Sequence, residues 1–368
     1  MKRIVLITNI PSPYRVDLFD YMQKNLTEYE FHVIYTSRSE DNRLWDINED
    51  KMKNSHVLES RVLKIRGKLD ARYVHLPGNI GALLSELEPD VVIGFEYNPA
   101  ALQSFFWCKL HKVKFIHLTD GTLYSERNVG KVQKLSRKLI IPHADASIAS
   151  STKAKEKLLA WGAKKESIFE SLLTVDTTPF LKADKCFGGN RILYVGSMIP
   201  RKGVDLLFNA MKYVDADYEL RIVGNGTAEE IEALKMQAKN LGIENKITWC
   251  GFKTGEALVE EYRQAAVFVL PTREDCFGLV LLEALSARTP IVSSKYADGA
   301  YDIVKDGENG FIVDPEDGKA MGEAISSILK DVALQKQFSE NCIPEIGRFS
   351  FEEVSKGYVK AIEYVNTK

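Results

Sequence analysis

Short apolar runs alternate with amphipathic stretches along most of the chain. Residues 91–95 and 267–272 are largely apolar without interruption, which is typical of parallel strands covered on both faces. Residues 204–214 repeat apolar side chains at i, i+3, i+4 and i+7, which predicts an amphipathic helix. Strands that alternate with helices predict α/β domains with parallel sheets. The predicted strands are residues 3–8, 31–36, 91–95, 114–119, 146–150, 191–197, 218–224, 246–251, 267–272, 290–294 and 310–313.

The series of strands and helices restarts at residue 191. The stretch before it, residues 182–190, is short, polar and contains glycine, which is typical of a linker. We therefore predict two Rossmann-like, doubly wound domains over residues 1–180 and 181–348 that face a cleft. Open α/β sheets bind ligands beyond the carboxyl ends of their strands, so the loops there are the first candidates for a site.

Composition and charge restrict the class of protein. Hydrophobic residues make up 45% and charged residues 27%, which is globular composition. Lys and Arg (49) nearly balance Asp and Glu (51), so the overall charge gives no reason to expect nucleic-acid binding. Residues 1–180 carry 26 Lys and Arg against 22 Asp and Glu, and the remainder carries 23 against 29. This asymmetry suggests two surfaces with different partners.

Cysteine spacing and apolar run length bear on the compartment. The 5 cysteines are scattered without a CxxC pair, and the N-terminal apolar run looks like a first strand rather than a secretory signal. No apolar stretch reaches the ~20 residues of a membrane-spanning helix. We expect a cytoplasmic protein without a metal site, whose contact with a membrane would be peripheral, at the inner face.

A first candidate site follows the first predicted strand of the second domain. Gly196 and Ser197 close that strand, and Arg201 and Lys202 lie in the loop before the next helix. Glycine permits close approach of the backbone, and free N–H groups at a helix N-terminus attract an anion. The two cations would neutralise a phosphate or diphosphate. The alternative is a solvated Arg–Lys pair in a turn, but the position after the first strand favours the anion site.

A second candidate site is an acidic loop followed by an apolar helix. Glu274 and Asp275 lie in the loop, Phe277 and Gly278 open the helix, and Glu283 lies within it. A carboxylate in such surroundings costs several kcal/mol unless it finds partners, and ribose hydroxyls are suitable donors. The alternative for Glu283 is a structural bond to the backbone or to a buried lysine. For the two loop acids the alternative is capping of the helix.

Three further positions lie in or after predicted strands. Gly299 follows residues 290–294 and either presents a backbone nest to an anion or caps a helix. Asp120 ends the strand at 114–119, where a general base or a hydroxyl-orienting group would lie, although a turn former fits as well. His117, inside that strand, is expected to be half-buried with its hydrogen bonds satisfied.

One predicted helix of the first domain is strongly basic. Lys131, Lys134 and Lys138 share a face, with Leu135 and Leu139 beside them. Such a helix can rest on anionic lipid. The alternative is a solvated basic face whose leucines pack inward.

At these sites the sequence resembles the family-four retaining glycosyltransferases of GT-B fold. The resemblance is strong over residues 158–330, and an earlier segment, LLAWGAKKESIFESLLTVDTTPF, resembles the family's interdomain lead-in. It implies transfer of a hexose-type sugar from a UDP- or GDP-type donor to a saccharide or lipid-linked saccharide, in cell-surface polysaccharide synthesis and without a bound cofactor. It also implies that residues 349–368 form a helix that crosses back to the first domain. The matching segments are LYVGSMIPRKGVDLLFNAM, LRIVGNG, ITWCGF, VFVLPTREDCFGLVLLEALSARTPIV and IVKDGENGFIV.

The resemblance implies a role for each matching residue. Arg201 and Lys202 match the cations on the diphosphate. Glu283 matches the ribose-binding second acid of an E-x7-E motif, and Asp275 matches the first acid, which holds the donor sugar. The remaining matches are the backbone near Gly278 and Leu279 at the sugar or phosphate, and Gly251 and Phe252 beside the base.

The sequence also departs from the family pattern. Asp275 replaces the usual Glu, and Ser197 replaces an Arg whose charge Arg201 would supply. The N-terminal loop has Pro-Ser-Pro where a glycine pair is usual. No histidine matches the acceptor-side His, and Asp120, with His117 in reserve, is the expected substitute.

The expected mechanism is retaining and independent of metal. The departing phosphate would take the acceptor proton on the same face, and no Asp-x-Asp metal motif is found in the predicted site loops. The alternatives are a GT-B nucleotide-sugar epimerase, a phosphorylase, or a non-catalytic subunit that binds sugar nucleotides.

Overall fold

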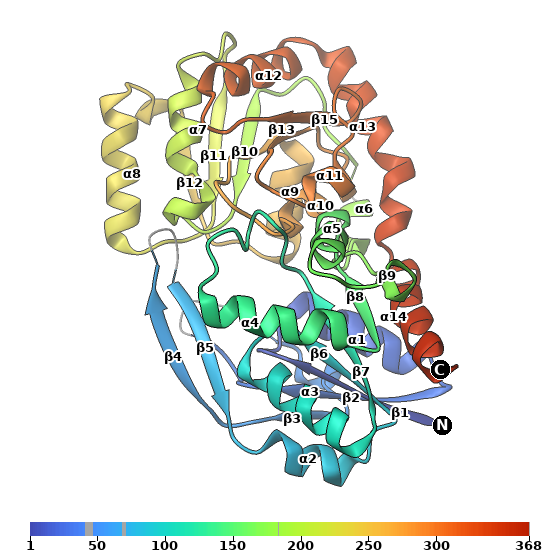
Figure 1. Cartoon of the computed structure of the whole chain (residues 1–368). Coiled ribbons are helices and arrows are strands. Elements are labelled where there is room, and N and C mark those ends of the chain that lie inside the picture. The colour runs from blue at the N-terminus through green and yellow to red at the C-terminus, as the bar shows by residue number, and fades with distance from the viewer. Residues whose placement is uncertain (41–46, 68–70, 183, 368) are drawn as a thin grey trace. The chain divides into compact units, whose positions relative to one another are not determined.

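The chain divides into two compact α/β units (Figure 1). The computed structural model describes residues 1–40, 47–67, 71–182 and 184–367. The first unit comprises Met1–Val175 and Phe351–Lys368, and the second comprises Asp176–Ser350. The predicted fold class is confirmed, since each unit has its own parallel sheet with helices. The units divide after residues 175 and 350, where the sequence pattern places boundaries at 180 and 348.

The first unit is built on a parallel sheet. Its described strands are β1 (Lys2–Thr8), β2 (Tyr29–Tyr35), β3 (Ser55–Val57), β6 (Val91–Phe95), β7 (Lys114–Thr119), β8 (Ala146–Ala149) and β9 (Ile168–Glu170). They lie in the order β3-β2-β1-β6-β7-β8-β9. Its described helices are α1 (Pro13–Asn25), α2 (Ile80–Leu87), α3 (Pro99–His111), α4 (Lys131–Ile140), α5 (Thr152–Ala160) and α14 (Phe351–Asn366).

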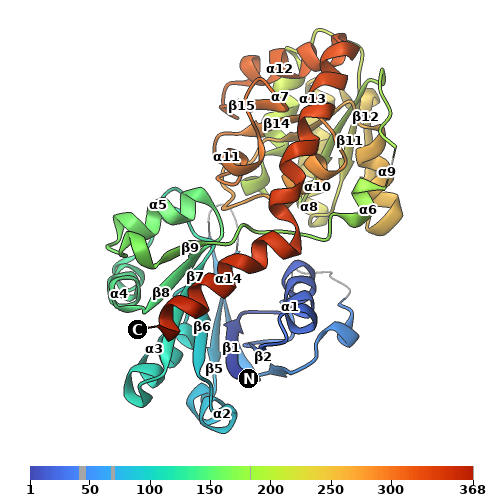
Figure 2. The same cartoon turned by 90° about the vertical axis from the view of Figure 1, so that its right-hand side faces the viewer.

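Helices cover both faces of this sheet. Ile4 and Leu6 of β1 pack with α1 and α14, whereas Val5 and Ile7 pack on the other face with α2, α3, α4 and α5. The two views agree that α3 and α4 lie on the opposite side of the sheet from α1 (Figures 1 and 2). Burial on both faces is the reason that these strands are continuous apolar runs in the sequence.

An antiparallel hairpin, β4 (Ser60–Arg66) with β5 (Ala71–Pro77), stands outside the main sheet of the first unit. The sequence pattern does not predict it. Val62, Leu63 and Ile65 are each more than a third exposed, so β4 buries neither face fully and shows no clean alternation of apolar and polar residues.

The second unit repeats the doubly wound plan. Its described strands are β10 (Arg191–Val195), β11 (Glu219–Val223), β12 (Ile247–Gly251), β13 (Val267–Leu270), β14 (Ile291–Ser294) and β15 (Gly310–Val313), all parallel in the order β12-β11-β10-β13-β14-β15. The core on one face of this sheet includes side chains of α7, α8 and α12. Its described helices are α6 (Thr178–Leu181), α7 (Val204–Met211), α8 (Ala228–Asn240), α9 (Gly255–Gln264), α10 (Leu279–Ser286), α11 (Ala300–Ile303), α12 (Gly318–Lys330) and α13 (Val332–Ile346).

All the predicted strands form, although several are shorter than predicted. The predicted helix at 204–214 is α7, which ends earlier, at Met211. The sequence pattern misses the short strands β3 and β9, which have three residues each. In both sheets the strand order reverses, between β1 and β6 and between β10 and β13, and ligands of such sheets bind at this switch point. Within the described residues, no helix is both long and apolar enough to cross a bilayer.

Candidate active site

Two loops of the second unit meet at its switch point. The loop after β10 carries Arg201 and Lys202, and the loop after the neighbouring strand β13 carries the acids. The main-chain oxygen of Arg201 accepts from the Thr272 hydroxyl at 2.9 Å and from the Arg273 N–H at 2.8 Å. Gly203 has φ +72°, and a Cβ on it would lie 2.1 Å from the oxygen of Pro271. Glycine is therefore required where the loops touch.

The predicted cation and acid lie in contact. Nζ of Lys202 donates to Oδ2 of Asp275 at 2.5 Å, and their side chains are 17% and 11% exposed. Burial alone raises the pKa of Asp275, but the charges of Lys202 and Arg201 more than offset it and hold that pKa below its usual value. Arg201 also donates to the main-chain oxygen of Glu274 at 3.1 Å. Asp275 is thus ionised and held beside two cations.

Glu283 has a different partner from either alternative considered above. Its Oε2 accepts a hydrogen bond from the Tyr262 hydroxyl, on α9, at 2.8 Å. Burial raises the pKa of Glu283 to about 7, and the Tyr262 bond only partly offsets this. The bond found is therefore not the one to a lysine or to the backbone that the alternative named, and the expected ribose-binding role stays a prediction. Near pH 7 both the protonated and the ionised form of this carboxyl group are populated.

The loop after β14 supports the acidic loop. The Asp275 N–H donates to the oxygen of Tyr296, and the Asp298 N–H donates to the oxygen of Asp275, both at 2.9 Å. A Cβ on Gly299 would lie 2.4 Å from the oxygen of Phe277, so this glycine is explained by close packing. The helix that follows, α11, has only four residues, which weakens the predicted role of Gly299 as an anion nest.

The other predicted positions are less closely grouped. Phe277 is 1% exposed, so its side chain belongs to the core, and only the main chain near Gly278 and Leu279 opens α10. Gly196 packs against Tyr194, whose hydroxyl donates to the oxygen of Ser197 at 2.7 Å. Gly251 ends the edge strand β12 and accepts a hydrogen bond from the Gly224 N–H at 2.9 Å, and Phe252, which follows it, is 51% exposed.

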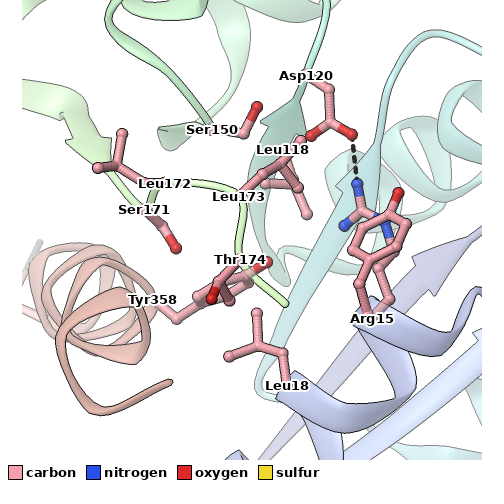
Figure 3. Close-up of a pocket in the computed structure, with 11 residues that line it drawn as sticks. Arg15, Leu18, Leu118, Asp120, Ser150, Ser171, Leu172, Leu173, Thr174 and Tyr358 are labelled. Atoms are coloured by element: carbon pink, nitrogen blue, oxygen red, sulfur yellow. Dashed lines mark hydrogen bonds and ion pairs between the residues drawn. The ribbon is translucent and has the colours of Figure 1, made fainter. Parts of the chain in front are cut away.

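In the first unit, Asp120 is paired with a residue of α1. Oδ2 of Asp120 accepts from Arg15 at 2.7 Å, and both side chains are buried. Its other oxygen, Oδ1, is buried without a hydrogen-bond partner among the described residues and points toward the side of Ser150 (Figure 3). A small cavity lies there, lined in addition by Ser171 and Tyr358. Asp120 is therefore more than a turn former.

The predicted environment of His117 is wrong. Its ring is fully buried, with its centroid 4.7 Å from that of Tyr97, rather than half-buried. Burial lowers the pKa of His117 well below its usual value, so the imidazole is neutral. A residue so enclosed cannot meet an acceptor, which removes it as a reserve for Asp120.

Glu96 is a candidate site residue that the sequence pattern does not single out. It follows β6 at the switch point of the first sheet and has φ +59°, which is strained for a residue with a side chain. Its carboxylate accepts the N–H groups of Asp120 at 2.7 Å and Gly121 at 3.1 Å. The sequence did hold one signal for Glu96, because it directly follows a predicted strand of the sheet, where ligand-binding residues are expected.

No group of three or more His, Cys, Asp or Glu side chains suited to a metal ion occurs in the part of the chain that the structure describes. Beside the two loop cations of the second unit, the Asp275 carboxylate is bonded to Lys202, whereas Arg201 donates to the main-chain oxygen of Glu274 and not to its carboxylate.

Comparisons with known proteins show what this chain is similar to. Residues 184–343 match the glycosyl transferases group 1 family. An uncharacterized glycosyltransferase MJ1607 of Methanocaldococcus jannaschii is 28% identical over 45% of this chain and 42% of its own length. A D-inositol 3-phosphate glycosyltransferase of Acidothermus cellulolyticus is 27% identical over 67% of this chain and 58% of its own length. The chain thus spans about half the length of the curated relatives it matches.

Solved structures match along the whole chain. The lipopolysaccharide outer core galactosyltransferase WaaB superposes with a TM-score of 0.75 at 19% identity, over 98% of this chain and 99% of that chain. Anabaena Alr3699/HepE, solved in complex with UDP, superposes with a TM-score of 0.78 at 16% identity, over 99% of this chain and 100% of that chain. Taken with the matched segment, this likeness means that the chain has the GT-B fold and that its residues 184–343 belong to the glycosyl transferases group 1 family.

Proposed function

We propose that this protein transfers a hexose-type sugar from a UDP- or GDP-sugar to a saccharide or lipid-linked saccharide, with retention of anomeric configuration, in cell-surface polysaccharide synthesis. The observation that carries the proposal is the ion pair between Lys202 and Asp275, which joins the carboxyl-end loops of adjacent strands at the switch point of the second unit. The fold of Anabaena Alr3699/HepE, which was solved with UDP, supports a nucleotide donor.

The second unit would bind the donor. Lys202 and Arg201 would meet the diphosphate, and the N–H groups at the start of α10 would add a helix dipole of the right sign. Glu283 in its ionised form would accept hydrogen bonds from the ribose hydroxyls. Asp275 would hold hydroxyls of the sugar.

The chemical step would depend on stabilising the leaving group. Negative charge grows on the departing β-phosphate oxygen, and each fixed donor aimed at it is worth about 3 kcal/mol. That phosphate oxygen would take the proton of the acceptor hydroxyl on the same face of the sugar, which retains configuration. The acceptor would be bound by the first unit, with Oδ1 of Asp120 orienting its hydroxyl. We propose that no metal ion takes part, and a rate that disappears in excess chelator would refute this.

A panel of UDP- and GDP-sugars tests the proposal. We expect either the UDP-sugars or the GDP-sugars to raise the unfolding temperature of the protein. A ligand at 100 times its Kd stabilises the folded protein by about 2.7 kcal/mol. An added acceptor should then release the nucleoside diphosphate. Conversion of the donor without acceptor would instead mean an epimerase, and binding without release would mean a non-catalytic subunit. If no member of the panel binds, the proposal fails.

A further inference from the structure

Helix α4 turns apolar side chains outward. Val132 is 82% exposed and Leu135 is 66% exposed, whereas Leu139 is half-buried. The side that α4 buries carries Arg137 and Ile140 instead. The alternative in which the leucines of this helix pack inward is therefore wrong for Leu135.

The outward orientation is fixed by buried ion pairs on the inner side of α4. Nε of Arg137 lies 2.7 Å from Glu126, and Glu126 lies 3.2 Å from Nζ of Lys157, whose side chain is fully buried. Turning the helix to bury Leu135 would expose Ile140 and separate Arg137 from Glu126. Breaking a buried pair is strongly destabilising. The exposure of Leu135 is therefore a property of the packed helix.

Lysines flank these apolar residues. Lys131, Lys134 and Lys138 are exposed, and neither α4 nor the adjacent helix α3 contains an acidic residue. Helix α3 contacts α4 on the same face of the sheet and exposes Phe106 by 56% and Leu110 by 78% (Figures 1 and 2). We call the two apolar pairs and the three lysines the α3–α4 surface.

We infer that the α3–α4 surface docks on the headgroup region of an anionic phospholipid bilayer. A helix with apolar residues beside lysines lies in the plane of such an interface, with the apolar residues at the acyl boundary and the ammonium groups among the phosphates. A protein partner would have to bring acidic groups to three lysines and apolar groups to four side chains. An anionic bilayer offers both kinds of group in one surface, with phosphates for the lysines and acyl chains for the apolar side chains. This inference goes beyond sugar transfer and does not rest on it.

Vesicle flotation of the full chain tests the inference. Binding is expected to vesicles of phosphatidylcholine with phosphatidylglycerol, to be far weaker to phosphatidylcholine alone, and to fall with added salt. Lys131→Gln, Lys134→Gln and Lys138→Gln together should weaken partitioning by about fivefold for each lysine removed. The pair Val132→Ser and Leu135→Ser should weaken it at any salt concentration.

Helix α8 of the second unit offers a matched control. Met236 is 61% exposed there, between the exposed Lys235 and Lys239. Met236→Ser with Lys235→Gln and Lys239→Gln should float like the wild type. Circular dichroism and thermal unfolding check that every variant is folded. The inference is wrong if the wild type does not bind anionic vesicles, or if it binds duplex DNA and not vesicles. It is also wrong if the α8 variant loses as much vesicle binding as the α4 variants.

Discussion

Nζ of Lys202 lies 2.5 Å from Oδ2 of Asp275, so the cation assigned to the diphosphate is bonded to the acid assigned to the sugar. Both side chains are largely buried. The pair keeps each charge compensated and holds the two loops at the switch point together. A bound diphosphate would compete with Asp275 for Lys202, which couples binding of the phosphates to the position of the acid that would meet the sugar.

Replacing Lys202 by methionine should impair both turnover and stability. Loss of a donor to the leaving group is expected to cut turnover by about 100- to 1000-fold. Asp275 would remain buried without its main countercharge, which is expected to lower the free energy of unfolding by about 3 kcal/mol. Steady-state rates and urea unfolding measure the two effects.

The double variant Lys202→Met with Asp275→Asn separates these effects, because it removes both charges of the pair. It should recover most of the stability and none of the turnover. A single variant that keeps the wild-type rate would show that Lys202 does not serve the diphosphate.

Donor affinity should depend on pH through Glu283. Its pKa is raised to about 7 by burial, so the ionised form that would accept ribose hydroxyls becomes dominant only above that pH. The Kd of the donor should fall as the pH rises from 6 to 8. Glu283→Gln should weaken binding by about 10- to 100-fold, the worth of a hydrogen bond to a charged group, and remove this pH dependence. Isothermal titration at several pH values would measure both.

The same shift has a consequence for stability. Because the folded pKa of Glu283 lies above the unfolded value of about 4.3, the wild type should lose stability as the pH rises from there to about 7 and none above it. Glu283→Gln lacks this loss and should be the more stable protein at pH 8, by about 3–4 kcal/mol. Equal stability of the two proteins at pH 8 would contradict the raised pKa.

Features that depend on neighbours along the chain were predictable. Buried parallel strands such as β6 and β13 are continuous apolar runs, and the loops that follow β10 and β13 could be singled out as a candidate site because each comes directly after a predicted strand. The seven residues between Asp275 and Glu283 matched one of the several motifs on which the resemblance rested. These signals are local in sequence, so periodicity and motif spacing reveal them.

Features that depend on distant partners were not predictable. The partner of Glu283 is Tyr262, on another helix, and no local pattern indicates which buried group will supply the hydrogen bond. Likewise, Glu96 is separated along the chain from the Asp120 turn that it holds. The outward orientation of Leu135 depends on ion pairs made by the opposite side of α4.

Gly203→Ala should disturb the site more than an equivalent change elsewhere. Its φ of +72° and that of Gly242, +68°, impose a similar backbone cost on alanine, about 1 kcal/mol. They differ in space, because a Cβ on Gly203 would lie 2.1 Å from the oxygen of Pro271, whereas nothing lies within 4 Å of one on Gly242. Gly203→Ala should therefore cost clearly more than Gly242→Ala in urea unfolding, and only Gly203→Ala should weaken donor binding. Equal costs would mean that the loops are not in contact there.

Lys157→Met should destabilise the first unit strongly. Its fully buried ammonium group donates to the Thr119 hydroxyl at 2.7 Å and pairs with Glu126, and it opposes the raised pKa that burial gives Glu96. Without Lys157, the carboxyl groups of Glu96 and Glu126 share Arg137 as their nearby cation. The free energy of unfolding is expected to fall by about 3–5 kcal/mol.

The pH dependence and a matched control distinguish this cause from lost packing. In Lys157→Met the pKa values of the carboxyl groups should rise, and a raised folded pKa removes stability as the pH rises. The deficit should therefore be larger at pH 8 than at pH 5. Lys155→Met, on the same helix and paired with Glu170 at the surface, should stay within about 0.5 kcal/mol of the wild type. A deficit of Lys157→Met that is independent of pH would mean that packing, and not charge, is what the ammonium group supplies.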